Sequence, residues 1–213
     1  MLISSYNRAA LGDVLITFVA EDTAAQVSEK RGDVVQIKDN QGQLLGYNFF
    51  NVTSSLGQLA DGQVFLDQAQ VDKLNALVHA AGFTDELVFD QEPKFVIGVV
   101  TEFKAHPDSD HLHITQVDLG GGHTEQIVCG APNAALGQHV VAALPGAMMP
   151  DGKMIWPGAL RGVDSYGMLC SARELALPNA PQERGILVLP DSIPAGTAFD
   201  FAKAAKFLAT AQA

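Results

Sequence analysis

The sequence predicts a mainly β protein with α+β character: a small α+β N-terminal domain followed by a C-terminal β-barrel with short extra helices. The first ninety or so residues combine β-rich runs with one stripe of helical period. The residues after them form short strand-like runs separated by Gly and Pro. An acidic, Pro-containing stretch at 85–93 lies between these two regions, and we expect it to be a linker. A chain of 213 residues is long enough for two such domains.

The N-terminal half begins with β-structure. The runs at 13–20 and 33–38 are rich in Val, Ile, Phe and other β-formers, which predicts two strands. The second run is followed by Asp-Asn-Gln-Gly at 39–42, a turn sequence, and then by the apolar run 44–52. This order predicts a hairpin in which 44–52 is the returning strand.

A helix is predicted over 67–81, where the apolar period changes from two to about 3.6. The apolar residues of this stretch form one stripe: Val71, Leu74, Leu77 and Val78. Asp67 is a suitable N-cap because its carboxylate can accept a backbone N–H, and Gly82 is a suitable C-terminal stop.

The second half is predicted to hold six short strands, at 95–104, 111–119, 125–129, 139–144, 153–156 and 185–189. Strands with turns every ten or so residues, over about a hundred residues, suit an OB-type barrel, which binds ligands on one face and the adjoining loops. The Ala-rich end is predicted to be a short helix. The predicted domains are therefore 1–89, 90–200 and a C-terminal helix or tail at 201–213.

Charge and hydropathy exclude several classes of protein. The chain has 24 acidic and 13 basic residues, which argues against a non-specific nucleic-acid binder. Most of the excess lies in the first 93 residues, which hold thirteen acidic and five basic side chains. No apolar stretch approaches the ~20 residues of a membrane span, and the N-terminus has no signal-peptide pattern. Two cysteines fit a reducing cytosol, so we expect a cytoplasmic protein.

Histidines gather at 106–113. On a strand, His111 and His113 would lie on one face, where a nearby Asp could complete a metal site. The alternative is a polar turn with both histidines at the surface. Because no Cys-x-x-Cys or His-Glu-x-x-His accompanies the cluster, we expect no metal and no other cofactor.

Cys129 has two interpretations as well. Its Cys-Gly-Ala-Pro sequence could expose a nucleophilic thiol, which would need a neighbouring base to lower its pKa. The pattern of residues 126–129 instead favours a small buried strand residue. The glycines at 120–122 separate two predicted strands, which indicates a hairpin turn rather than a phosphate-binding loop. No convincing catalytic centre is present, so we expect a protein that is not an enzyme.

The Gly-punctuated segment 160–171 carries an Arg, two Ser, a Tyr and a Met. Arg161, Ser165 and Ser171 suit contacts to phosphate and ribose, and an exposed Met168 can pack on a base. The alternative is a glycine-kinked strand that buries Met168 and Leu169 in the core.

Ordered motifs in the second half carry a family resemblance. They include His106-Pro107, Gln126 to Asn133, Leu144 to Ala147, Leu160 to Val163 and Gly167 to Ser171. This half resembles the tRNA-binding OB domain of bacterial phenylalanyl-tRNA synthetase beta subunits and of EMAP-II-like proteins. The residues before it are similar to the N-terminal domain of free-standing tRNA-binding proteins of the YtpR type.

The resemblance implies a non-catalytic protein that docks tRNA on the face and loops of the barrel. It places Asn133, Ser165, Met168 and Ser171 on tRNA-facing loops, with Arg161 and Lys153 as neighbouring cations. An alternative is a chaperone-like or protein-interaction module of the same fold. The acidic N-terminal domain favours a protein partner, because negative charge repels RNA, and a homodimer is also open.

Overall fold

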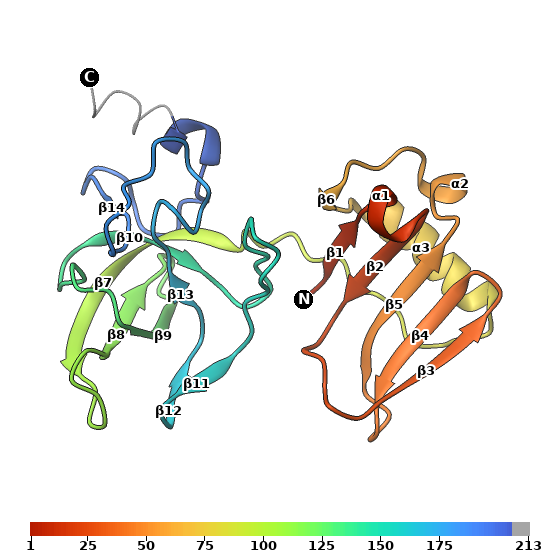
Figure 1. Ribbon diagram of the computed structural model, residues 1–213, viewed down its shortest axis with the longest axis horizontal. Helices are drawn as coiled ribbons and strands as arrows, with labels where there is room; N and C mark the ends of the chain where they lie inside the picture. Colours follow the sequence, from red (N-terminus) through yellow and green to blue (C-terminus); the bar gives the residue numbers. More distant parts are fainter. Residues whose placement is uncertain (206–213) are drawn as a thin grey trace. The chain divides into compact units, whose positions relative to one another are not determined.

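The computed structural model describes residues 1–205 and divides into two compact units, Met1–Gln91 and a second from Glu92 onward. Both units consist mainly of strands, as the sequence predicts (Figure 1). Residues 201–205 form a helical turn, and the rest of the predicted C-terminal helix lies outside the described residues. Within 1–205, no helix is long and apolar enough to cross a membrane.

Unit 1 contains one antiparallel sheet. Its six strands follow the order β3 (Gln26–Arg31), β4 (Val34–Asp39), β5 (Leu44–Phe50), β2 (Val14–Phe18), β1 (Ile3–Tyr6) and β6 (Gly62–Gln63). The predicted hairpin is the β4–β5 pair. The sequence does not predict β1, β3 and β6. Strand β3 is exposed at every position and has Val27 as its one apolar residue, so it has no apolar alternation, and β1 and β6 are very short.

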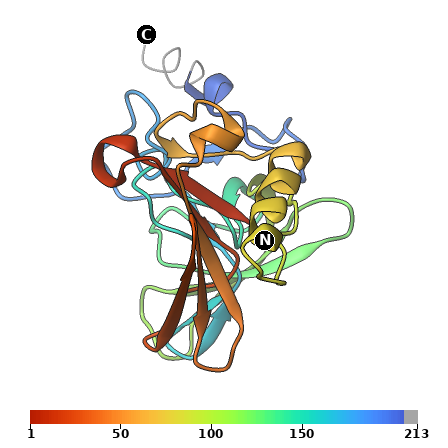
Figure 2. The same cartoon turned by 90° about the vertical axis from the view of Figure 1, so that its right-hand side faces the viewer.

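Helix α3 (Gln68–Ala80) lies along one face of this sheet (Figure 2). Asp67 is its N-cap as predicted, and Gln70 completes a capping box with it. The buried side chains of the helix, Val71, Leu74 and Val78, pack with the aromatic residues of β5 in one core. Single-turn helices α1 (Arg8–Leu11) and α2 (Thr53–Leu56) flank the sheet.

The interpretation of 85–93 as a linker is wrong for most of its length. Leu87 is buried in the core of unit 1. The Asn75 side chain donates to the Leu87 carbonyl at 2.9 Å and accepts from its N–H at 2.8 Å, while Lys38 pairs with Asp85 at 2.7 Å. An apolar side chain inside an acidic run therefore anchors this stretch to the sheet and helix.

Unit 2 is built on the strand path β13 (Met168–Leu169), β10 (His139–Ala143), β7 (Phe95–Ala105), β8 (His113–Asp118) and β9 (Thr124–Cys129). Strand β14 (Val188–Leu189) also pairs with β10. The path closes because the Tyr166 N–H donates to the Gln126 carbonyl at 2.8 Å and the Val128 N–H donates to Ser165 Oγ at 3.1 Å. The result is the predicted OB-type barrel.

A two-stranded ribbon of β11 (Gly158–Leu160) and β12 (Val163–Ser165) projects from the barrel (Figure 1). The predicted strand at 153–156 is wrong. Met154 forms only an isolated bridge with Met148, because the chain turns back on itself, with the Met149 N–H donating to the Lys153 carbonyl at 2.7 Å. The predicted strand at 185–189 shortens to the two residues of β14.

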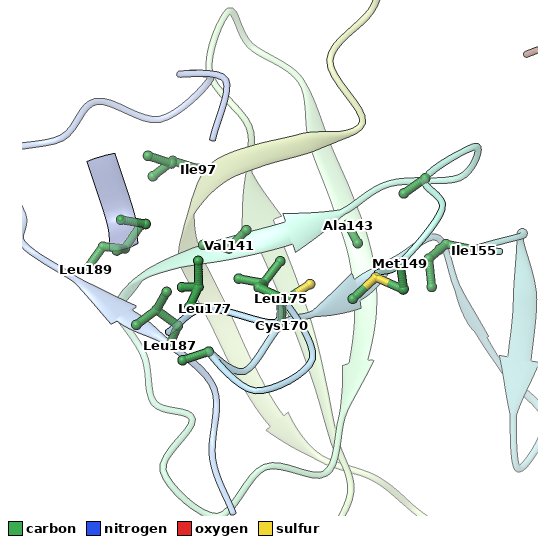
Figure 3. Packing of buried hydrophobic residues seen from close by; sticks show 13 residues of the cluster. Ile97, Val141, Ala143, Met149, Ile155, Cys170, Leu175, Leu177, Leu187 and Leu189 are labelled. Carbon is green, nitrogen blue, oxygen red and sulfur yellow. The ribbon is translucent and has the colours of Figure 1, made fainter. Parts of the chain in front are cut away.

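Strand β10 separates two apolar cores. Successive side chains of a strand point to opposite faces. Val140 and Ala142 therefore enter the barrel interior, whereas Val141 and Ala143 enter a second cluster formed with the 170–190 segment. Figure 3 shows this second cluster, in which Leu175, Leu177 and Leu187 cover the outer face of β10. The long 170–190 segment is thus held by buried leucines although it has little regular structure.

Asp13 offers a test of unit 1. Its carboxylate accepts from Thr53 Oγ at 2.6 Å and from the Tyr6 hydroxyl at 3.0 Å, and these bonds, with the Thr53 bond the larger cause, hold its pKa below the ordinary value. A lowered pKa stabilises the folded state at neutral pH, and that stabilisation is lost as the pH falls through the folded pKa.

We expect Asp13→Asn to lower the melting temperature of unit 1 at pH 7 by about 4–8 °C, as a loss of roughly 1 kcal/mol would in a unit of this size. The difference in melting temperature between the variant and the natural protein should become smaller below pH 4. Calorimetry across pH 2.5–7 measures this, with Asp22→Asn on an exposed loop as the matched control. A gap that does not change with pH would show that the charge of Asp13 is not what stabilises the unit.

Candidate functional site

Three hollows adjoin one another on unit 2, and Arg184 lines all of them. The Met168 hollow, of about 410 Å³, also contains Ser171 and Arg173. The Phe103 hollow, of about 670 Å³, shares the Gly130–Pro132 turn with it, and the Asn133 hollow, of about 280 Å³, shares Ser171 and Arg173. We call the three together the groove.

The turn after β13 presents Arg173 to the groove. Ser171 Oγ donates to Glu174 Oε2 at 2.7 Å and accepts from the Glu174 N–H at 3.1 Å, while the Ser171 N–H donates to the same carboxylate at 2.8 Å. These reciprocal bonds cap the turn, and Leu175 just after it is buried. Arg173, between the capped residues, is left exposed at the groove wall.

Asn133 holds the loop that carries Arg184. Its Nδ2 donates to the Ile186 carbonyl at 2.9 Å, and its Oδ1 accepts from the Ile186 N–H at 2.8 Å. The loop comes so close that a Cβ at Gly185 would lie 2.7 Å from Asn133 Oδ1. Both ends of the Asn133 amide are bonded to the backbone of Ile186. Asn133 therefore fixes the backbone of the loop that carries Arg184.

Another set of bonds joins the 106–108 turn to the tip of the β11–β12 ribbon. The Asp108 N–H donates to Nδ1 of the buried His106, so the proton on the ring is on Nε2, which lies 3.1 Å from the Leu160 carbonyl and donates to it. Arg161 Nη1 donates to the Asp108 carbonyl at 2.7 Å. These bonds hold the ribbon tip against the 106–108 turn of the barrel, and Leu160 lines the Met168 hollow.

Arg161 has an unusual backbone conformation for an arginine. It has φ of +47° and Gly162 has φ of +81°, in a two-residue turn between the paired Leu160 and Val163. Asn and Gly adopt this conformation most readily, so an arginine here is held at some cost in backbone strain. The exposed guanidinium uses one donor on Asp108 and keeps the others for further contacts.

The floor of the Met168 hollow is apolar and includes Leu112, Val128 and Leu169. Cys129, which also lines it, is buried as the strand pattern favours, and burial raises the pKa of its thiol. Burial also raises the pKa of the Cys170 thiol, to about 12. Neither cysteine has the lowered pKa of an activated nucleophile.

The histidine cluster has a different geometry from the one expected for a metal site. Strand β8 begins only at His113, so His111 lies in the preceding loop, where its Nδ1 contacts Asp110 Oδ1 at 2.9 Å. This contact is the main cause that lowers the pKa of the Asp110 carboxyl. His113 instead stacks on Phe103. Among residues 1–205, no three His, Cys, Asp or Glu side chains gather as a metal site would require.

The structure brings together some of the residues predicted from the sequence and not others. Met168 and Ser171 line the groove, and Asn133 lines its edge. Arg161 is not itself in the lining but directly follows Leu160, which is. Ser165 is buried, and its hydroxyl is engaged with the Val128 N–H and the Gly167 carbonyl. Lys153 is exposed on the 147–155 loop and does not line the hollows.

Sequence reasoning assigned no RNA-binding role to Phe103, His113, Arg173 and Arg184, which also line the groove. Arg173 follows the Ser171 motif by two residues and could have been found from it. Arg184 lies in a loop with two prolines, Pro178 and Pro181, that carries no motif. Both arginines are exposed, and among residues 1–205 neither guanidinium is paired with a carboxylate.

Two family models match the chain. Residues 21–90 match the "Domain of unknown function (DUF4479)", and residues 95–198 match the "Putative tRNA binding domain". The second match covers the barrel and every lining residue of the groove. The first covers most of unit 1.

Similar proteins include the "Phenylalanine--tRNA ligase beta subunit" of Neisseria gonorrhoeae, 46% identical over 129 residues, which are 59% of this chain and 16% of that one. The solved chaperone CsaA of Bacillus anthracis str. Ames is 18% identical, with a TM-score of 0.35, over 50% of this chain and 89% of that one, a likeness too weak to bear on function. The "Putative tRNA-binding protein YtpR" of Bacillus subtilis is 45% identical over 198 residues, 92% of this chain and 98% of that one. An identity of this level over nearly the whole of both proteins shows that the chain belongs to the YtpR family.

Proposed function

We propose that this protein binds tRNA, without catalysis, in the groove of unit 2. The observation that carries the proposal is the pair of exposed arginines, Arg173 and Arg184, beside an apolar floor in the domain that matches the tRNA-binding family model. Guanidinium groups recognise phosphate oxygens through paired N–H donors, and an apolar floor accepts sugars and bases. The name of its YtpR relative supports the same function.

The predicted site residues take different parts in this proposal. Arg161 at the ribbon tip and Met168 on the floor contact the RNA, together with Ser171 at the wall. Asn133 and Ser165 act through the structure, because their polar groups are already bonded to Ile186 and Val128. Lys153, outside the groove, makes only a peripheral phosphate contact.

We assign no chemistry to the groove, because its thiol, Cys129, has a raised pKa and is buried. A tRNA partner supports a cytoplasmic location for the protein. Unit 1, with its excess of acidic residues, repels RNA and is suited to a basic protein surface. Protein partners that survive ribonuclease treatment in a pull-down would favour the protein-interaction alternative instead.

The arginine pair supplies the main test. We expect Arg173→Ala with Arg184→Ala to weaken tRNA binding roughly tenfold or more at low salt, because two phosphate contacts are lost. The slope of log affinity against log salt should become shallower by about 1.4 to 1.8. Fluorescence anisotropy with bulk bacterial tRNA at several salt concentrations measures both quantities.

Lys104→Ala with Lys203→Ala is the control, since it removes the same charge from unit 2. Lys104 neighbours Phe103 on β7 and points to the opposite face, and Lys203 pairs with Asp200. If the arginine variant keeps its affinity for tRNA, or if the lysine variant loses as much affinity, the assignment of tRNA to the groove is wrong.

Arg161 allows stability and binding to be separated. We expect Arg161→Asn to weaken tRNA binding several-fold but to leave the melting temperature within about 3 °C of the natural value. Asn tolerates the φ of +47°, and this relief offsets the lost bond to Asp108. Thermal melting measures the stability of the variant, and anisotropy on the same preparation measures its affinity for tRNA. A large fall in melting temperature would contradict the strain argument.

The thiols provide a test of the non-catalytic assignment. At pH 8 we expect Cys170 of the folded protein to react with a thiol reagent roughly a thousandfold more slowly than a free cysteine, since a pKa of about 12 leaves little thiolate. Cys129 should also be slow, and both should react fully in urea. Single Cys→Ala variants identify the thiol that reacts. Rapid labelling of Cys129 in the folded protein would revive the nucleophile hypothesis.

A further inference from the structure

An aromatic pair lies at one end of the barrel interior. The Phe103 ring on β7 and the His113 ring on β8 are stacked, with centroids 4.2 Å apart and planes 19° apart. His113 faces Ala105 across the two strands, and this small residue leaves room for the imidazole to lean over Phe103. Both rings are half-buried, so each presents part of its surface to the Phe103 hollow.

A β-bulge puts Phe103 on this face. Val100 points into the barrel, and strict alternation would turn Phe103 away from it. The pairing with β8 shifts between Val100 and Glu102, which inserts one extra residue and reverses the faces beyond it. Phe103 consequently faces Thr115 and packs against the interior cluster. The bulge therefore supplies an aromatic surface at the end of the barrel interior.

The Phe103 hollow combines this aromatic surface with groups of complementary chemistry. Ala131, Pro132 and Ala134 form apolar walls, and Arg184 brings a positive charge that it also presents to the Met168 hollow. Asp110 adds carboxylate oxygens, which accept hydrogen bonds from amino groups but repel phosphate. A flat, partly polar ring attached to an anionic group fits all of these features.

We propose that the Phe103–His113 pair is a subsite for one unpaired base of the bound RNA, with the adjoining phosphate on Arg184. The inference rests on the proposed RNA-binding function and adds to it that recognition requires a single-stranded nucleotide. Bases within a duplex are stacked on both faces and cannot reach an aromatic platform, whereas bases in loops and at ends can. The groove then binds folded RNA at a point where a duplex stops.

The experiment compares two labelled RNA hairpins whose stems are closed by the same non-nucleotide linker, so that neither has an unpaired loop base. One is blunt, and the other has a four-nucleotide single-stranded 3′ tail that contains 2-aminopurine. We expect the natural protein to bind the tailed hairpin more tightly and to quench its 2-aminopurine fluorescence by stacking. His113→Leu and Phe103→Leu should weaken binding of the tailed hairpin roughly 5- to 100-fold and remove the quenching, because aliphatic side chains lack the flat face. Binding of the blunt hairpin should stay as it is in the natural protein.

His113→Phe is the matched variant that keeps the ring. His113 Nδ1 is buried and has no hydrogen-bond partner within residues 1–205, so a phenyl ring removes a polar atom that the fold does not use. This variant should fold normally and bind the tailed hairpin within about twofold of the natural protein. His123→Leu, at the exposed β8–β9 turn, controls for loss of a histidine elsewhere.

The outcomes separate the two proposals. If the natural protein binds neither hairpin nor tRNA, the proposed function fails. If it binds tRNA but prefers neither hairpin, or if His113→Leu leaves the tailed hairpin and its quenching unchanged, the base subsite is overturned and RNA binding stands. If His113→Phe loses as much affinity as His113→Leu while both melt normally, the ring nitrogens and not stacking would carry the contact, which also overturns the subsite.

Discussion

Closure of the barrel at Gly167 is the constraint on which the rest of unit 2 depends. Gly167 has φ of +146°, and a Cβ there would lie 2.7 Å from the Ala143 carbonyl oxygen, so the chain passes β10 at a distance that no other residue allows. Ser165 and Tyr166, just before it, bond to the backbone of β9. This passage carries Met168 and Ser171 from the barrel seam directly into the groove, next to the end of β9.

The groove combines a rigid base with side chains on loops. Buried leucines of the 170–190 segment pack on the outer face of β10 (Figure 3). Arg173 and Arg184 of the same segment remain at the surface. Asn133 and the Ser171–Glu174 turn then hold the backbone around each arginine through hydrogen bonds. A ligand therefore meets charges that are already positioned, which reduces the entropy lost on binding.

The location of charge matters more here than its total. The chain as a whole is strongly acidic, and the excess is greatest in unit 1. At physiological salt, charges separated by more than about 8 Å of solvent are largely screened, so local arginines govern contacts within the groove.

Local patterns in the sequence determined much of this protein: the β4–β5 hairpin, the Asp67-capped helix α3, the main barrel strands and the motif that leads to Met168 and Ser171. These features depend on side-chain period and on turn chemistry within a few residues, which the sequence displays directly. Only the tertiary structure decided that Ser165 and Asn133 serve as internal hydrogen-bond partners. It also brought Arg184 beside Asn133, about fifty residues earlier in the chain. The Phe103–His113 pair likewise required the bulge in β7 and the pairing of Ala105 with His113. Strand register and bulges reverse which face a residue occupies, and they are set by packing between distant segments, so no local pattern reveals them.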